Sequence, residues 1–384
     1  MNITRKNQII FYAFSFLIGF YLANGTTVLF EQALNFSYSQ IFTLGAVYML
    51  MFILFNVPAG ALADIIGRKK TLIVGSFLLV AAALTTGISN NFVQVFFSFF
   101  IWSCGFSFII GADQALLYDA TKDDTDYAKG WGKASFFALI GTAAAGIIGP
   151  ILYSQYFRYP YIFSSLPFFA AAVVIMFFKE ERKERTFSWQ NYKTKTITGV
   201  KYALKNRHVL WATGILALTF GAMYTFTNSY QPYLTGVGFS VKAFSIILPV
   251  MFAIQAAGGA IAGKLYEKIG DMKIFVLAVI GIALSLIALG ELNLKISLVF
   301  LFLFNFLLGI INPITSTYTN RYISGDLRAT IVSVQMMMST IAAALMLFLF
   351  GFLTDKVGLH YLLIILGAMV FVGGVTLLMF KPKE

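Results

Sequence analysis

Long apolar stretches, separated by short polar ones, run through nearly the whole chain. Each is about 20 residues long, the length that an α-helix needs to cross the roughly 30 Å hydrocarbon core of a bilayer. The pattern predicts twelve membrane-spanning helices, at 8–30, 40–63, 71–89, 92–120, 131–155, 159–178, 208–233, 241–268, 273–290, 296–323, 330–353 and 360–380. The sequence therefore predicts an all-α membrane protein with little chain left over for a soluble domain.

Composition and charge agree with this prediction. Of the 384 residues, 59% are hydrophobic and only 11% are charged, too few for a water-facing surface of this size. All but four of the 28 lysines and arginines fall on the predicted face that carries both termini; the exceptions are Arg158, Lys242, Lys295 and Lys356. Because basic residues stay on the cytoplasmic side, both termini are predicted to be cytoplasmic. The net charge of +12 then fits anionic lipid better than nucleic acid.

One long polar stretch, 179–207, divides the chain into a predicted N-terminal bundle of six helices, 1–178, and a C-terminal one, 208–384. The stretch begins with a dense run of charges. Further along, lysines alternate with apolar residues that fall close to one helical face: Trp189, Tyr192, Ile197, Val200 and Leu204. Two interpretations stay open, an amphipathic helix in the cytoplasmic interface or a solvated linker between the bundles.

A motif after the second predicted helix recurs half a chain later. Residues 60–70 read GALADIIGRKK, and residues 263–273, which lie 203 positions on, read GKLYEKIGDMK. Glycine, leucine, an acid, glycine and lysine recur in register, which indicates duplication of a large unit. Duplicated membrane halves are typical of secondary transporters, which hold their substrate between the halves near the bilayer midplane.

The chemistry of the first copy suggests a switch. Gly60 is expected to allow close helix packing, and Gly67 a tight turn. Asp64 and Arg68 are about one helical turn apart, so they can pair or share a charge network. Such a cluster would hold the cytoplasmic ends of the two halves in one of two states. A change of a few kcal/mol in the free energy of the cluster would shift the populations of the two states.

These residues make the chain similar to the major facilitator superfamily, whose signature in this loop is G-x-L-x-D-x-x-G-R-K/R-K/R. Gly60, Asp64, Gly67, Arg68 and Lys69 match it at full spacing. The resemblance covers the whole chain and implies two pseudo-symmetric six-helix bundles.

The resemblance also implies a cytoplasmic gate formed by Asp64, Arg68 and an acid at the end of helix four, for which Asp119 is the candidate. A second motif of the superfamily is similar to 325–330, and it adds Arg328 to the gate.

Two further acids are candidates for proton coupling. Asp113 lies within a predicted span, and an intramembrane carboxylate is a functional hypothesis by default. It either carries protons or bonds to a gate arginine, such as Arg68 or Arg328. Glu31, at the outer end of the first helix, is either an interfacial acid or a second coupling site.

Three departures from the superfamily pattern weaken the expectation of proton coupling. Helix four lacks the arginine that drug–proton antiporters usually carry there. Helix five has only Gly149 and Pro150 of its signature. Helix two has Asn56 where many relatives of similar type have glutamate.

The resemblance places the substrate site on the inward faces of helices one, four, seven and ten and their neighbours. The polar candidates there are uncharged: Asn24, Gln114, Tyr224, Asn228, Gln255, Asn305, Asn312 and Gln335. Each either lines the cavity or forms a hydrogen bond between helices. A cavity without fixed positive charge favours neutral, amphipathic or cationic organic molecules over strongly anionic ones.

The sequence thus predicts a secondary active transporter that works by alternating access as a monomer in the plasma (inner) membrane. Efflux of small amphipathic or drug-like molecules, with protons as the candidate coupling ion, is the leading interpretation. The alternatives are uptake or facilitated diffusion of a small neutral nutrient, and a membrane sensor or enzyme that does not transport.

Neither an enzyme nor a cofactor is expected. The acids gather at the gating loops rather than around a reactive centre, and the sequence has no G-x-x-x-x-G-K-[ST] motif for a nucleotide. The two histidines, His208 and His360, are predicted on opposite faces of the membrane, so no metal site is expected.

Overall fold

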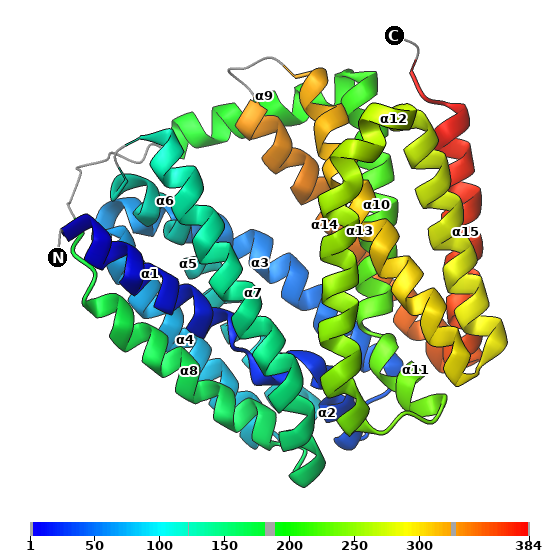
Figure 1. Cartoon of the computed structure of the whole chain (residues 1–384), viewed down its shortest axis with the longest axis horizontal. Helices are drawn as coiled ribbons and strands as arrows, with labels where there is room; N and C mark the ends of the chain where they lie inside the picture. Colours follow the sequence, from blue (N-terminus) through cyan, green and yellow to red (C-terminus); the bar gives the residue numbers. More distant parts are fainter. Residues whose placement is uncertain (1–2, 122, 181–188, 324–327, 383–384) are drawn as a thin grey trace. The chain divides into compact units, whose positions relative to one another are not determined.

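The computed structural model describes residues 3–121, 123–180, 189–323 and 328–382, and every regular element within these ranges is helical. Most of the charge run after Glu180, and the residues 325–327 of the second motif, lie outside them. Figure 1 shows the helices in chain order.

The chain forms two compact units. Unit 1 comprises Met1–Phe36, Val47–Phe187 and Ser240–Pro249, and unit 2 comprises Ser37–Ala46, Ser188–Phe239 and Val250–Glu384. The elements of unit 1 are α1 (Ile3–Gly19), η1 (Leu22–Gly25), α2 (Thr27–Ala33), most of α3 (Tyr38–Ile66), α4 (Arg68–Ile88), α5 (Phe92–Ile109), α6 (Ala112–Asp119), α7 (Asp124–Gln155), α8 (Tyr159–Met176) and η2 (Val241–Ala243). Those of unit 2 are α9 (Trp189–Lys205), α10 (Arg207–Thr227), α11 (Tyr230–Gly236), most of α12 (Phe244–Leu292), η3 (Lys295–Ser297), α13 (Leu298–Arg321), α14 (Arg328–Val357) and α15 (Leu359–Met379).

Eleven helical segments of the described chain are long and apolar enough to cross a membrane. One of them, Val241–Leu292, has 52 residues, more than twice what a single crossing needs. Within it, α12 reverses at Gly270, whose φ of 76° and ψ of 169° are not helical, so the segment consists of two arms. Counting both arms gives the twelve spans that the apolar pattern predicts.

The predicted helix 92–120 contains a break that the apolar pattern does not reveal. It consists of α5 and α6, which are separated at Ile110 and Gly111. Gly111 has a φ of 95°, in the left-handed region that favours glycine. The short α6 therefore has its own N-terminus, where the first backbone N–H groups need hydrogen-bond acceptors.

Polar side chains at the ends of the spans begin several helices. The side chain of Asn91 accepts a hydrogen bond from Gln94 N at the start of α5, and Asp123 accepts one from Asp126 N at the start of α7. Asn206 caps α10 in the same way. These caps satisfy backbone donors that have no partner within the helix.

Glycines allow close helix crossings in both units. A Cβ atom at Gly141 of α7 would lie 2.2 Å from the carbonyl oxygen of Phe16 in α1. In unit 2, a Cβ atom at Gly309 of α13 would lie 2.1 Å from the carbonyl oxygen of Gln255 in α12. Real Cβ atoms do not approach so closely, so glycine is required at both crossings, as is common between helices in membranes.

Each unit includes one helix end from the other half of the sequence. In unit 2, the carboxylate of Asp355 accepts hydrogen bonds from Tyr38 N (2.8 Å) and Ser39 N (3.0 Å), which caps the first turn of α3. In unit 1, the side chain of Leu248 packs against Gly25 and Gly146. The units therefore do not follow the predicted domain boundaries residue by residue.

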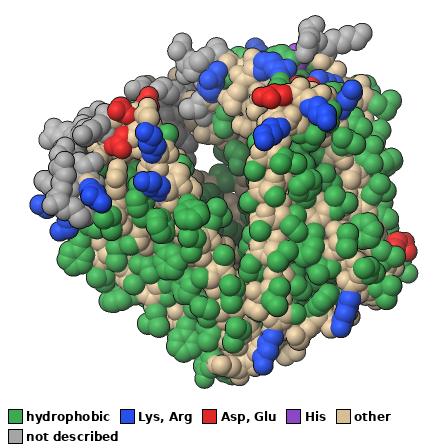
Figure 2. All heavy atoms as spheres, in the orientation of Figure 1, with side chains coloured by type: hydrophobic (Ala, Val, Ile, Leu, Met, Phe, Trp, Pro, Cys, Tyr) green, Lys and Arg blue, Asp and Glu red, His purple; other side chains and the backbone are tan. Residues whose placement is uncertain are grey.

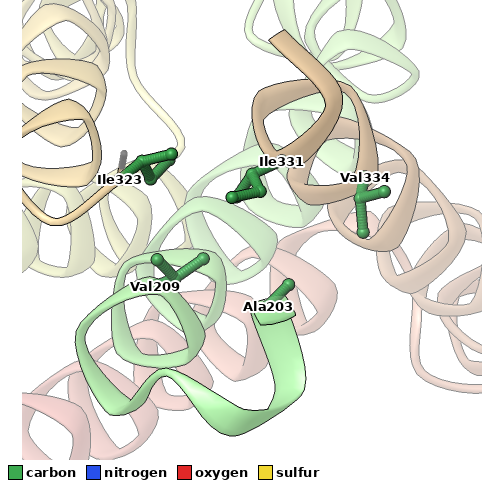
Figure 3. Packing of buried hydrophobic residues seen from close by; sticks show 5 residues of the cluster. All are labelled: Ala203, Val209, Ile323, Ile331 and Val334. Carbon is green, nitrogen blue, oxygen red and sulfur yellow. The ribbon is translucent and has the colours of Figure 1, made fainter. Parts of the chain in front are cut away.

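The linker contains a helix, α9, that packs against α10 and α14 within unit 2. Ala203 of α9 joins Val209, Ile323, Ile331 and Val334 in a buried apolar cluster (Figure 3). Val200 packs against the cluster, whereas Ile197 and Leu204, which lie about 100–120° around the helix from Ala203, are exposed.

Candidate functional site

The turn between α3 and α4 contains the first motif, and the chain changes direction at Gly67. Gly67 has a φ of 96°, a value that L-residues with a side chain rarely adopt. Its N–H donates to the carbonyl oxygen of Ala63, which ends α3, and α4 begins at the next residue. The turn thus directs Arg68 away from α3 within a single residue.

Arg68 points at the end of α6 and is 8% exposed. Its guanidinium forms an ion pair with the carboxylate of Asp119 and donates a hydrogen bond to the carbonyl oxygen of Ala115. The two residues are 51 positions apart, so the contact joins helices that the sequence does not connect directly. A charge-assisted pair with so little exposure is strong and specific in geometry.

Glu180, at the start of the linker, completes this site and was not among the predicted residues. Its carboxylate accepts hydrogen bonds from Arg68 N at 2.7 Å and Lys69 N at 3.3 Å, and so caps the N-terminus of α4. A carboxylate is favourable there because the helix dipole is positive at that end.

The backbone next to Glu180 is held in place by Asn7 of α1. The Asn7 amide donates to the carbonyl oxygen of Lys179 (2.8 Å) and accepts from Lys179 N (3.0 Å). Asn7 therefore fixes the position of Glu180 through this pair of bonds. Sequence reasoning had no signal for this role beyond the charge of Glu180 and its place directly after helix six.

Other residues of the predicted gate lie outside this cluster. Within the described part of the chain, the carboxylate of Asp64 forms neither an ion pair nor a hydrogen bond, and Arg328 is exposed at the start of α14. A Cβ atom at Gly60 would meet no atom within 4 Å, so the role expected for this glycine stays a prediction.

The second copy of the motif repeats the arrangement with the charges exchanged. Gly270, the counterpart of Gly67, also has a positive φ, of 76°. The next residue, Asp271, pairs with Arg321 at the end of α13 (3.3 Å) and with Lys381 (3.5 Å). Tyr266 also bonds to Arg321.

Asp113 is held by its own helix. Its Oδ1 atom accepts hydrogen bonds from Gly111 N (2.9 Å) and Gln114 N (2.7 Å), at the break between α5 and α6. In the described structure it makes no bond to Arg68 or Arg328. Asp113, in the first turn of α6, thus satisfies two N–H groups at the start of that helix.

Glu31 lies on α2, beyond the end of the first candidate span at Gly25, and is only 2% exposed. Its Oε2 atom is buried and has no hydrogen-bond partner in the described structure. The phenols of Tyr21 and Tyr161 lie close enough to interact with its charge. Burial raises the pKa of Glu31 well above its usual range because the ionised form loses its hydration.

The predicted cavity residues fall into two groups. Three have side-chain amides that bond within unit 2: Asn228 donates to Tyr224 O, Asn305 to Leu301 O and Gln335 to Thr319 Oγ1. The others are exposed or half-buried, and their side chains form no hydrogen bond with another described residue: Asn24, Gln114, Tyr224, Gln255 and Asn312. The second group keeps its polar atoms available for a ligand.

Among the described residues, no group of three or more His, Cys, Asp or Glu side chains is placed to hold a metal ion. Among them, when Val241–Leu292 is divided into its two arms at Gly270, the basic residues of the candidate spans lie near span ends and none lies in a middle third.

Two repeated bundles of apolar helices, each with an ion pair beside its motif turn, are the architecture of a membrane transporter. The sequence matches the Major Facilitator Superfamily over residues 9–346 and 236–384. The chain belongs to this family.

Two relatives from bacteria extend over most of the chain. An uncharacterized MFS-type transporter of Bacillus subtilis (strain 168), YxaM, is 22% identical over 391 residues, which cover 94% of this chain and 93% of the relative. A cis,cis-muconate transport protein of Acinetobacter baylyi is 23% identical over 354 residues, which cover 86% of this chain and 82% of the relative.

Solved structures show the same fold at low identity. The nucleoside transporter NupG superposes with a TM-score of 0.83 at 14% identity, over all of both chains. A POT family transporter in complex with a thioalcohol-conjugated peptide gives 0.77 at 14% identity, over 98% of this chain and 96% of that chain.

Proposed function

We propose that the chain is a proton-coupled efflux transporter for small uncharged or cationic amphipathic molecules, which it moves by alternating access. The observation that carries the coupling is the carboxyl of Glu31, which is buried, has an unpartnered oxygen and pairs with no described cation. A carboxyl in such a place is more stable when protonated, since its charge has no compensation. It therefore holds a proton that a change of conformation or of solvent access can release.

The surroundings of Glu31 support proton binding over cation binding. Phe30 and Tyr161 have ring centroids 4.7 Å apart, and Tyr21 lies tilted against Trp102 at 4.8 Å. The phenols of Tyr21 and Tyr161 interact with the charge of Glu31, so the carboxyl has aromatic neighbours. A metal ion in such a place would lack the several oxygen ligands that hard cations need. A proton requires only the carboxyl itself.

Asp113 fits the role of proton carrier less well. Its carboxylate already accepts two backbone N–H bonds at the start of α6, whereas Glu31 Oε2 has no hydrogen-bond partner in the described structure. We therefore assign Asp113 to the structure of the broken helix and Glu31 to coupling.

The substrate class follows from the polar side chains that remain available. These side chains are amides and one phenol, which offer hydrogen bonds to a ligand. No basic group lies in the middle of a described span, so no positive charge is available there to neutralise an anion. An uncharged or cationic molecule with apolar parts suits such groups, and aromatic faces can hold a cation.

The muconate transport protein gives a second candidate, a small dicarboxylate. A dianion in a low-dielectric site requires paired cations, typically Arg or Lys. The arrangement of basic residues in this chain favours the first candidate.

The test is transport in liposomes that contain the purified protein and an internal pH dye. Neutral, cationic and zwitterionic compounds, and muconate, are added in turn under an imposed pH gradient. We expect uncharged or cationic amphipathic compounds to trigger a proton flux and muconate to trigger none. Saturable transport without any proton flux would instead favour facilitated diffusion or uptake of a neutral nutrient. A flux with muconate alone would reverse the substrate assignment.

A further inference from the structure

Unit 2 carries an apolar groove between the two arms of α12 and α13. Its volume is about 320 Å³, and aliphatic, phenylalanine and glycine residues line it throughout. They include Leu265 of the first arm, Ile274, Leu277 and Gly281 of the second arm, and Leu303 and Ile310 of α13. Leu277 is 57% exposed and Leu303 is 39% exposed, so the groove opens at the surface of the unit.

The groove has the depth of one membrane leaflet. Ile274 lies four residues from the reversal at Gly270, and Gly281 lies eleven residues from it. At 1.5 Å per residue the lining therefore extends to about 16 Å from the reversal, close to half of the roughly 30 Å hydrocarbon core. Both arms and α13 lie within candidate membrane spans, so the groove lies at the depth of the membrane.

Lysines surround the end of the groove nearest the reversal. Lys264 directly precedes Leu265, Lys273 directly precedes Ile274, and Lys268 lies one turn after Lys264; all three are exposed. Figure 2 shows Lys and Arg side chains gathered at this end of the unit, above a surface of hydrophobic side chains.

The acids near these lysines do not cancel their charge. Two acids fall within residues 263–273: Glu267, which is exposed, and Asp271, which is engaged by Arg321 and Lys381. The mouth of the groove is therefore positive. The lysines belong to the second copy of the repeated motif, which does not contain the arginine that pairs with Asp119 in the first copy.

We propose that this groove binds an anionic phospholipid of the cytoplasmic leaflet, with one acyl chain between α12 and α13 and the phosphate at Lys264, Lys268 and Lys273. The apolar lining accounts for the chain, and the depth of the groove matches the leaflet. The lysines account for the selection of an anionic headgroup, because each basic residue near a membrane surface attracts such lipids. The second motif copy thereby serves as a lipid anchor.

Brominated lipids test this proposal on the full chain. A tryptophan placed at Leu277 reports bromine in the groove, and one at Leu284, which is also exposed and lies two turns further along the same face, reports bulk lipid. Each variant is reconstituted in mixtures of phosphatidylglycerol and phosphatidylcholine, with one or the other brominated. The quenching of the parent protein, which has 4 tryptophans, is subtracted.

At position 277 we expect brominated phosphatidylglycerol to compete at least about fivefold better than brominated phosphatidylcholine, the factor that one surface lysine contributes. At position 284 the two lipids should compete equally. In the Leu277→Trp protein that also carries Lys264→Gln, Lys268→Gln and Lys273→Gln, the preference should disappear.

Three results would overturn the proposal. Equal competition at 277 would mean that the groove holds bulk lipid of any headgroup. A preference that survives the three glutamines would mean that the lysines do not recognise the phosphate. A tryptophan at 277 that no brominated lipid quenches would mean that another protein segment covers the groove.

Discussion

Asp271 takes in unit 2 the place that Arg68 takes in unit 1, with the opposite charge. Each directly follows a glycine of positive φ and begins the next helical arm. Each pairs with an oppositely charged residue at the end of another helix, Arg68 with Asp119 and Asp271 with Arg321. The pair is therefore the repeated element of the two motif copies, whichever partner carries the positive charge.

Loss of either partner of the Arg68–Asp119 ion pair should disturb the contact between the start of α4 and the end of α6. Arg68→Ala or Asp119→Asn leaves a nearly buried charge without its partner, which is strongly destabilising for the state that contains the pair. We expect the ratio of the inward and outward states to change by roughly tenfold or more, and transport to slow. Labelling of Gln114→Cys in a Cys104→Ser background measures the ratio.

Two further variants sharpen this prediction. The double exchange Arg68→Asp with Asp119→Arg reproduces the polarity of unit 2 and should recover part of the lost transport. Asp64→Asn should have a smaller effect than Asp119→Asn, because Asp64 has no described partner. Normal turnover and unchanged labelling in both Arg68→Ala and Asp119→Asn would refute the role of the pair.

Gly67→Ala should destabilise the protein by roughly 1–3 kcal/mol, because alanine is strained at a φ of 96°. Its Cβ atom would also lie 3.0 Å from the Glu180 carboxylate that caps α4. Thermal unfolding in detergent measures the loss. Gly60→Ala is the matched control and should change stability by no more than about 0.5 kcal/mol, since its Cβ atom meets open space. Equal effects of the two substitutions would contradict this account of the turn.

The contrast between Asp113→Asn and Asp113→Ala tests the hydrogen bonds at the start of α6. Asparagine keeps an oxygen that can accept the same N–H bonds, whereas alanine removes the acceptor at a loss of about 1 kcal/mol. We expect Asp113→Asn to keep substrate-triggered proton flux and stability, and Asp113→Ala to lower the unfolding temperature. Loss of proton flux in Asp113→Asn, with the protein still folded, would return the coupling role to Asp113.

Stability should depend on pH through Glu31. Because burial raises its pKa, the folded protein keeps a proton on Glu31 that the unfolded chain releases near the ordinary glutamate pKa of about 4.3. The stabilisation is thus complete below that pH and is lost as the pH rises towards the folded pKa. The difference in unfolding temperature between Glu31→Gln and the parent should grow from pH 5 to pH 8. Parallel curves for the two proteins would contradict the burial of an uncompensated carboxyl.

The sequence was sufficient for the features that depend on local pattern. Apolar periodicity predicts the twelve spans, because the bilayer demands a fixed length of apolar helix. The motif predicts the turn at Gly67, because its spacing places a glycine directly after α3. The reversal at Gly270 follows from the same spacing in the second copy.

Features that depend on contacts across the fold were not predictable from the sequence. The role of Glu180 depends on Asn7, 173 residues earlier, which holds the adjacent backbone. The break before α6 depends on a single glycine, Gly111, inside an otherwise continuous apolar run. The burial of Glu31 depends on aromatic side chains from other helices. The residues next to Glu31 in the sequence do not predict these contacts.

The central claim is that Glu31 couples solute movement to protons, and the Glu31→Gln protein tests it most directly. Two rates are measured in the same liposomes: substrate-driven proton flux, and exchange of labelled for unlabelled substrate without a gradient. Glu291→Gln, the same change at an exposed glutamate, is the control. The account predicts that Glu31→Gln loses the proton flux and keeps the exchange, while Glu291→Gln keeps both. A proton flux that persists in Glu31→Gln would contradict it.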